Sequence, residues 1–194
     1  MVNISKLEKL IRALYEEKQA NRAVWADWLY ANHVFVVADQ AELLAKKYGA
    51  DISEARAAAV LHDIADTTTG RFDPRHEEKS AEIARDLLQK SDFINEQIEL
   101  IVEDALRFHS CHNGEQPNSL VGQILATADS YAHLRSPFYI YATSQHAKNG
   151  KSYGEIMAWL NAKLDRDYNN KILFEDEKAD LAPDYEFWKG VFSA

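Results

Sequence analysis

The sequence predicts an all-α fold, and three observations support this prediction. Apolar residues recur at helical spacing along nearly all of the 194 residues. Residues that commonly begin or end helices, such as serine, aspartate, proline and glycine, stand at the ends of these apolar segments. No segment has a pattern that commits it to a strand. We therefore expect one helical domain over residues 1–194.

Three helices and a loop are predicted in the first part of the chain. The apolar positions of residues 4–14 define an amphipathic helix. A second helix runs from about residue 23 to Gly49, because glycine tolerates the left-handed conformation of a C-terminal cap. Ser53 caps the third helix, which ends near residue 63. The threonine-rich segment 67–70 breaks the pattern and predicts a loop.

The remaining helices are predicted from their start signals. The pair Asp73-Pro74 begins a helix that reaches about Gln89, and Asp92 begins the next one, which ends at His109. Ser119 caps a strongly apolar helix after a polar turn. Further helices begin at the capping box of residues 152–155 and at Pro183.

Composition and charge exclude several classes of protein. A net charge of −9 argues against broad nucleic-acid binding, which depends on clustered lysine and arginine. No apolar run approaches the ~20 residues that cross a bilayer. The N-terminal residues lack the apolar core of a signal peptide. The single cysteine, Cys111, cannot form an internal disulfide, and we expect a cytoplasmic protein.

Four residues are candidate metal ligands. His62 and Asp63 are adjacent at the end of an alanine-rich helix, and His33 lies upstream among apolar residues. Asp129 follows the apolar run 124–128, and a carboxylate buried there is costly unless it is paired or binds a metal. Neutral imidazole and carboxylate are the usual ligands of zinc, manganese and iron. The four residues together predict a metal site.

The ordered set His33, His62-Asp63 and Asp129 resembles the H…HD…D pattern of the HD-domain metal-dependent phosphohydrolase superfamily. The resemblance covers about half of the chain. It implies an HD-domain-like helical bundle with a metal-binding core of about residues 23–134 and a helical extension over about 135–194. It also implies that His33, His62, Asp63 and Asp129 bind the metal. In dinuclear subgroups two further histidines bind a second ion, and His76 and His109 occupy the matching places.

The same resemblance implies a metal-dependent phosphohydrolase. Its substrate would be a small phosphorylated molecule, with a nucleotide favoured, and its cofactor a divalent ion, one of Mn, Fe, Co, Zn, Ni or Mg. Asp63 is the expected bridge between two ions, and Asp66 and Lys79 are candidates for proton transfer or charge stabilisation. Arg71 and Arg107 are among the candidate phosphate contacts.

Alternative interpretations remain open for several features. His76 at a helix start and His109 at a helix end are also explained without function, the latter by the helix dipole. His112 is a candidate for a metal or substrate contact, and His133 for a residue that orients Asp129. Asp66 is also explained as a helix-end aspartate that bonds to the Thr67-Thr68 loop. A di-iron oxygenase and a non-catalytic nucleotide sensor are alternative functions, and a homodimer is left open.

Overall fold

The computed structural model describes residues 2–71 and 73–193, and within these ranges it contains helices and no strand. The all-α prediction is confirmed. None of the helices in the described part is both long and apolar enough to span a bilayer. In chain order the elements are α1 Ile4–Glu16, α2 Ala26–Asn32, α3 Val34–Tyr48, α4 Ile52–Leu61, η1 Ile64–Thr67, α5 His76–Lys90, α6 Asn95–Glu99, η2 Leu100–Leu106, η3 His112–Gly114, α7 Leu120–Leu134, α8 Phe138–Lys148, α9 Tyr153–Arg166, η4 Asp167–Lys171 and α10 Glu175–Ser193.

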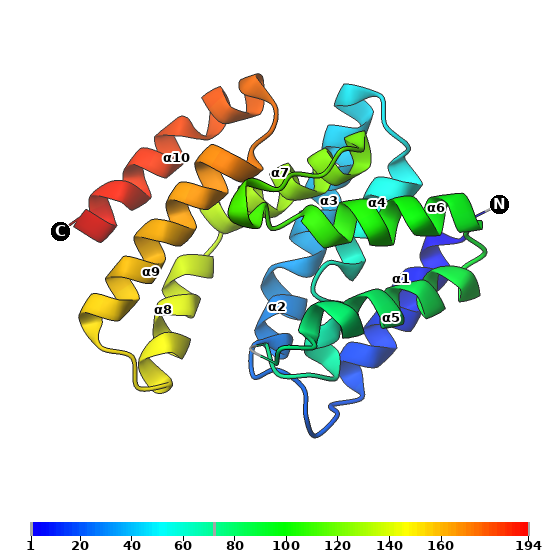
Figure 1. Ribbon diagram of the computed structural model, residues 1–194, viewed down its shortest axis with the longest axis horizontal. Helices are drawn as coiled ribbons and strands as arrows, with labels where there is room; N and C mark the ends of the chain where they lie inside the picture. Colours follow the sequence, from blue (N-terminus) through cyan, green and yellow to red (C-terminus); the bar gives the residue numbers. More distant parts are fainter. Residues whose placement is uncertain (1, 72, 194) are drawn as a thin grey trace.

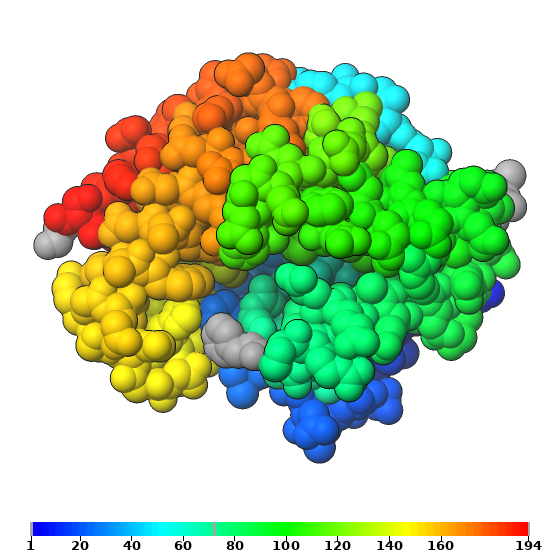
Figure 2. Space-filling model, in the orientation of Figure 1, coloured from blue at the N-terminus to red at the C-terminus, as the bar shows by residue number. Residues whose placement is uncertain are grey.

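Helices α3, α4 and α7 form the centre of the molecule, where each packs against the other two. Helix α7 is buried along most of its length because its sequence is apolar on nearly every face. Helices α1, α5 and α6 cover one side of this centre, and α8, α9 and α10 lie on the other side of α7 (Figure 1). The space-filling view shows a recess between α5, the segment before α7, and α9 (Figure 2).

The extension after residue 134 is tied to the core by specific contacts. The indole N–H of Trp188 in α10 donates to the carbonyl of Leu134 at 2.9 Å. Arg135 pairs with Asp184 at 2.8 Å between Nε and Oδ2. Tyr48 at the end of α3 stacks on Phe174, with ring centroids 3.9 Å apart. The extension therefore packs on the helices that carry the candidate ligands.

The structure corrects two boundaries near these ligands. The helix predicted from about residue 23 to Gly49 is divided into α2 and α3, because His33 leaves the helical conformation with φ −132° and ψ −60°. Gly49 is the left-handed cap that the sequence predicts, with φ 77°. The cap of α4 is Asp51, whose carboxylate accepts from the backbone N–H of Glu54, and the prediction of Ser53 was wrong by two residues.

Three later boundaries also differ from the prediction. Helix α5 begins at His76, because the Asp73 carboxylate accepts from the backbone N–H of Arg75 in a turn that precedes the helix. Asp92 has a positive φ of 65° and the following helix begins at Asn95. Pro183 lies inside α10 rather than at its start. Ser119 and the capping box Ser152–Glu155 are confirmed.

Asp104 anchors the start of α7, and its removal should weaken the fold in a pH-dependent way. Its carboxylate accepts from the backbone N–H groups of Asn118 and Ser119 at 2.8 and 2.9 Å. Burial raises the pKa of Asp104, but these hydrogen bonds outweigh burial and the pKa is lowered. Its contribution is therefore complete above the unfolded pKa near 4 and is lost as the pH falls through the lower folded pKa.

We expect Asp104→Asn to lower the free energy of unfolding by about 1 kcal/mol at pH 7 and by less at pH 3. Urea denaturation at the two pH values measures this difference. Asp86→Asn is the control, because the exposed Asp86 carboxylate contacts the Lys90 ammonium. A loss of equal size at pH 3 and pH 7 would show that the Asp104 charge has no part in the effect.

Candidate metal centre

Three helical segments bring His33, His62 and Asp129 together in the core. His33 lies at the break between α2 and α3, His62 follows the last residue of α4, and Asp129 is in the middle of α7. Their relative exposures are 1%, 4% and 3%, so all three polar side chains are buried. Burial of this kind is costly unless the groups find partners.

The spacing of their donor atoms fits a metal ion. His33 Nε2 lies 3.1 Å from His62 Nε2 and 3.0 Å from Asp129 Oδ1, and His62 Nε2 lies 3.8 Å from the same oxygen. Ligand atoms about 2.0–2.2 Å from one ion stand about 3–3.5 Å apart, and two of these three distances lie in that range. Asp129 Oδ1 is buried and accepts no hydrogen bond from the described residues. These three residues therefore form a group that can hold a metal ion.

Hydrogen bonds to backbone carbonyls orient two of the histidine rings. His62 Nδ1 lies 2.6 Å from the carbonyl of Ala59, and His109 Nδ1 lies 2.6 Å from the carbonyl of Leu106. A carbonyl only accepts, so each Nδ1 carries a hydrogen, and in the neutral ring Nε2 then keeps its lone pair. This is the usual arrangement of a histidine that binds a metal through Nε2.

The protonation states at neutral pH also suit metal binding. Burial lowers the pKa of His33, and it lowers the pKa of His109 to about 4. Burial alone raises the pKa of the Asp63 and Asp129 carboxyls, but neighbouring groups outweigh it, chiefly Arg71 at Asp63 and His133 with Lys171 at Asp129, and both pKa values are lowered. His33 and His109 are therefore neutral and the carboxylates charged, which is the state that a metal requires.

Asp63, the fourth predicted ligand, lies beside the three but is turned toward an arginine. Its Oδ2 is 3.6 Å from His62 Nε2 and 3.2 Å from the Arg71 guanidinium. Arg71 also pairs with Asp66, which is fully buried. The second oxygen of Asp66 is 2.9 Å from His76 Nε2. Asp66 therefore connects the predicted ligand His76 to the charged groups around Asp63.

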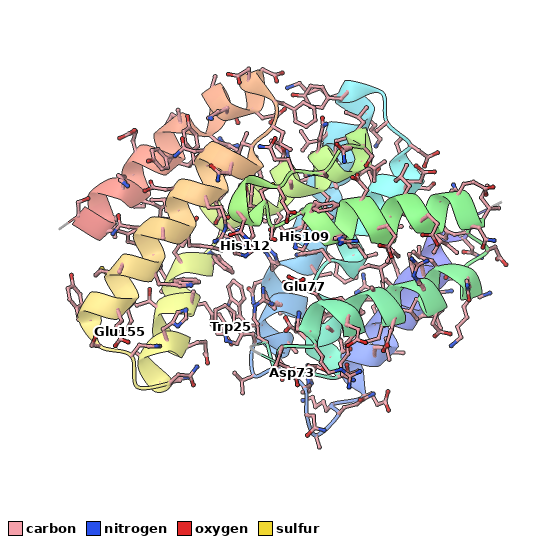
Figure 3. The ribbon with its side chains drawn as sticks, viewed as in Figure 1. Trp25, Asp73, Glu77, His109, His112 and Glu155 are labelled. Carbon is pink, nitrogen blue, oxygen red and sulfur yellow. The ribbon has the colours of Figure 1, made fainter. Side chains whose placement is uncertain are left out.

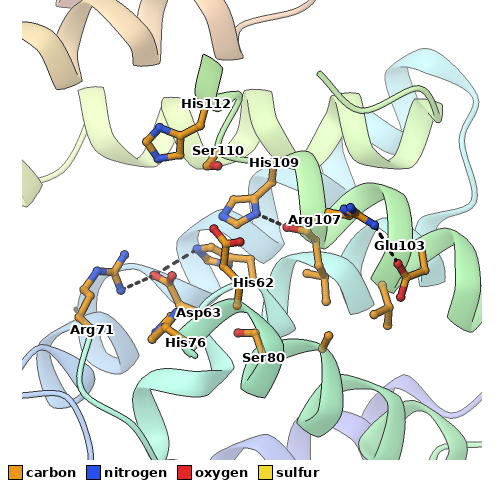
Figure 4. Close-up of a pocket in the computed structure, with 14 residues that line it drawn as sticks. His62, Asp63, Arg71, His76, Ser80, Glu103, Arg107, His109, Ser110 and His112 are labelled. Carbon is orange, nitrogen blue, oxygen red and sulfur yellow. Dashed lines mark hydrogen bonds and ion pairs between the residues drawn. The ribbon is translucent and has the colours of Figure 1, made fainter. Parts of the chain in front are cut away.

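A cavity of about 450 Å³ opens beside these residues. Asp63, His76 and Ser80 lie on one side of it and His109, Ser110 and His112 on the other (Figure 4). His109 and His112 also face Glu77 across the recess (Figure 3). The cavity is lined by His62, Asp63, Arg71, His76, Glu77, Ser80, Ala81, Val102, Glu103, Leu106, Arg107, His109, Ser110 and His112. The predicted catalytic residue Lys79 lies on α5 outside this lining.

Further charged residues lie behind Asp129. His133 Nε2 is 3.2 Å from Asp129 Oδ1, and its role in orienting Asp129 stays a prediction. The Lys171 ammonium pairs with Asp129 Oδ2, and Lys163 and Asp167 lie close by. Sequence reasoning missed these three residues of the extension, because they stand in a polar segment that is typical of a solvated helix face.

Comparison with known proteins identifies the family. The family model of the HD domain matches residues 30–134, more than half of the chain, and this region contains His33, His62, Asp63 and Asp129. No curated protein and no solved structure matches the chain. The HD domain is all-α, in agreement with the fold, and proteins of this kind bind divalent metals and are commonly hydrolases. With a matching family model over this region and a convergent ligand cluster within it, the chain belongs to the HD-domain family.

Proposed function

We propose that the protein is a metal-dependent phosphohydrolase that cleaves a small phosphate ester, with a nucleotide favoured as substrate. One observation carries the proposal: His33 Nε2, His62 Nε2 and Asp129 Oδ1 lie at metal-ligand distances from one another, next to a cavity with cationic side chains. In this proposal His33, His62, Asp63 and Asp129 hold a first divalent ion. His76 and His109 hold a second, with Asp63 between the two.

The residues around the cavity have separate proposed roles. A divalent ion lowers the pKa of a bound water from 15.7 to about 7 and so supplies a nucleophile near neutral pH. Asp66 contacts His76 and Arg71 through its two carboxylate oxygens, and His76 would exchange this contact for the second ion. The Arg71 side chain is 25% exposed and lines the cavity, so its guanidinium can donate to a phosphoryl oxygen. Lys79 lies on α5 outside the cavity lining and is given no role in this proposal.

The cavity suits a small anionic substrate. Its volume of about 450 Å³ is within the range of ordinary small-molecule sites, about 300–1,000 Å³. Arg71 and Arg107 line it, and they offset the charge of a phosphate group in a protein with a net charge of −9. Glu77 and Glu103 also line it and are suited to accept hydrogen bonds from hydroxyl or amino groups of the substrate.

A phosphate-release screen tests the proposal. The purified protein is stripped with a chelator, reloaded with Mn²⁺, Co²⁺, Zn²⁺ or anaerobic Fe²⁺, and given nucleoside mono-, di- and triphosphates, cyclic nucleotides and p-nitrophenyl phosphate. We expect phosphoester cleavage only in the metal-loaded samples. Protein that binds metal by elemental analysis but cleaves no phosphoester would contradict the proposal. Oxygen consumption by the Fe²⁺ form alone would favour the oxygenase alternative.

A further inference from the structure

A buried group of charged residues connects the extension to the metal centre. Lys163, Asp167 and Lys171 lie outside the region that matches the family model, and their relative exposures are 9%, 0% and 2%. The Lys163 ammonium contacts both oxygens of Asp167 at 2.6 and 2.7 Å. Lys171 pairs with Asp129 in α7, and its ammonium is 3.8 Å from Asp167 Oδ1. Lysine is almost never this buried unless it is paired.

The backbone holds Lys171 firmly at this place. Asp167 and Lys171 begin and end η4, a π-helical turn, and such turns are frequent at functional sites. The hydroxyl of Thr127 donates to the carbonyl of Lys171 at 3.3 Å and accepts from the backbone N–H of Leu173 at 3.1 Å. Thr127 is two residues before Asp129 on α7. The same helix therefore carries the metal ligand and fixes the segment that supplies its lysine.

Lys171 contacts one oxygen of Asp129 and leaves the other for the ligand cluster. The ammonium is bound to Oδ2, and Oδ1 is the oxygen that lies 3.0 Å from His33 Nε2. The Lys171 ammonium, 2% exposed and in contact with both Asp129 and Asp167, is therefore a cationic partner of a predicted metal ligand.

We infer that Lys171 is a resident counter-cation of Asp129, which keeps the ligand cluster assembled in the metal-free protein and weakens its affinity for the metal. This inference rests on the metal centre of the proposed function. When a metal is absent, the ammonium neutralises the buried carboxylate and holds Oδ1 toward His33 and His62. When a metal binds to Oδ1, the ammonium on Oδ2 repels it, because two positive charges then share one carboxylate. Lys171 is thus a positioning residue supplied by the extension.

Lys171→Met tests this role, with thermal melts in chelator and in excess Mn²⁺ and with isothermal titration of Mn²⁺. We expect the metal-free Tm to fall, because Asp129 becomes a buried charge without a cation. We expect the Mn²⁺-induced rise in Tm to exceed that of the wild type and the Kd for Mn²⁺ to fall by at least about tenfold. Equal Tm shifts and equal Kd values in the two proteins would overturn the inference.

Lys163→Met is the matched control, since this buried ammonium pairs with Asp167 rather than with Asp129. It should lower the Tm by a similar amount with and without Mn²⁺. An Mn²⁺-induced shift as large in Lys163→Met as in Lys171→Met would assign the effect to buried lysines in general and would overturn the specific role of Lys171.

A metal-free comparison keeps the inference separate from the proposed function. In chelator, the double variant Lys171→Met/Asp129→Asn should melt at a higher temperature than Lys171→Met, because the uncompensated carboxylate is gone. If Lys171→Met is unable to fold in chelator, two results support the Lys171–Asp129 pair: the double variant folds in chelator, or Lys171→Met folds once Mn²⁺ is added. If neither variant folds under these conditions, the inference is overturned. A wild type that binds no Mn²⁺ would contradict the proposed function, whereas the double-variant comparison would still decide the Lys171–Asp129 pair.

Discussion

Replacing Asp63 by alanine should remove most of the bound metal and nearly all phosphoester cleavage. Asp63 lies next to His62, its carboxylate is charged at neutral pH, and its Oδ2 is 3.6 Å from His62 Nε2. In the proposed site it is the residue that would serve both ions. Altering residues that only orient a ligand costs about 10–100-fold in affinity or activity, so loss of the ligand itself should cost at least about 100-fold.

Elemental analysis of purified protein and phosphate release under saturating Mn²⁺ measure the two losses. Asp39→Ala is the matched control, because this exposed carboxylate pairs with Arg56 away from the cavity, and it should retain both metal and activity. Asp63→Asn separates charge from shape, since it keeps the side-chain size and should also lose metal. Wild-type metal content in Asp63→Ala would refute the assignment of Asp63 as a ligand.

The sequence predicted the helical fold well because its signals are local. Apolar spacing, the glycine at position 49, Ser119 and the capping box at 152–155 act within one or two turns, and the structure confirms each of them. The errors arise where tertiary contacts override local preference. At His33 a continuous apolar pattern hides a break that turns the imidazole toward α4 and α7. At Pro183 a common helix-start signal is accommodated inside α10.

The candidate site was predictable only in part for the same reason. His33, His62 and Asp129 could be predicted because their order along the chain matches a family pattern, and the structure brings them together. The structure turns Asp63 toward Arg71, a contact that residue order does not specify. Lys171 is 42 residues from its partner Asp129, and the polar segment around it gives no sign of burial. Long-range ion pairs depend on how helices pack, which local patterns do not encode.

His76 and His109 are predicted to bind a second ion, so the wild type should hold two metal ions per chain at saturation. Both residues line the cavity. The ring centroids of His109 and His62 are 5.7 Å apart. His109 Nδ1 donates to the Leu106 carbonyl, so Nε2 of the neutral His109 ring keeps its lone pair. To hold a second ion, His76 would have to give up its contact with Asp66, and Asp63 its contact with Arg71. The Arg71 guanidinium, which also pairs with Asp66, would then be available to a substrate phosphate.

Anomalous scattering at the manganese edge and metal-to-protein ratios count the ions directly. We expect two anomalous peaks in the wild type and one in His109→Ala and in His76→Ala, because each of these variants keeps the ligands of the first ion. His112→Ala is the control and should keep two peaks, since His112 lines the cavity but has no part in the proposed ligand set. One peak at His33, His62, Asp63 and Asp129 in the wild type at saturating metal would establish a mononuclear centre. The hydrolase proposal would survive that result, because a single ion is sufficient to activate water, and His76 and His109 would then be left to contact the substrate.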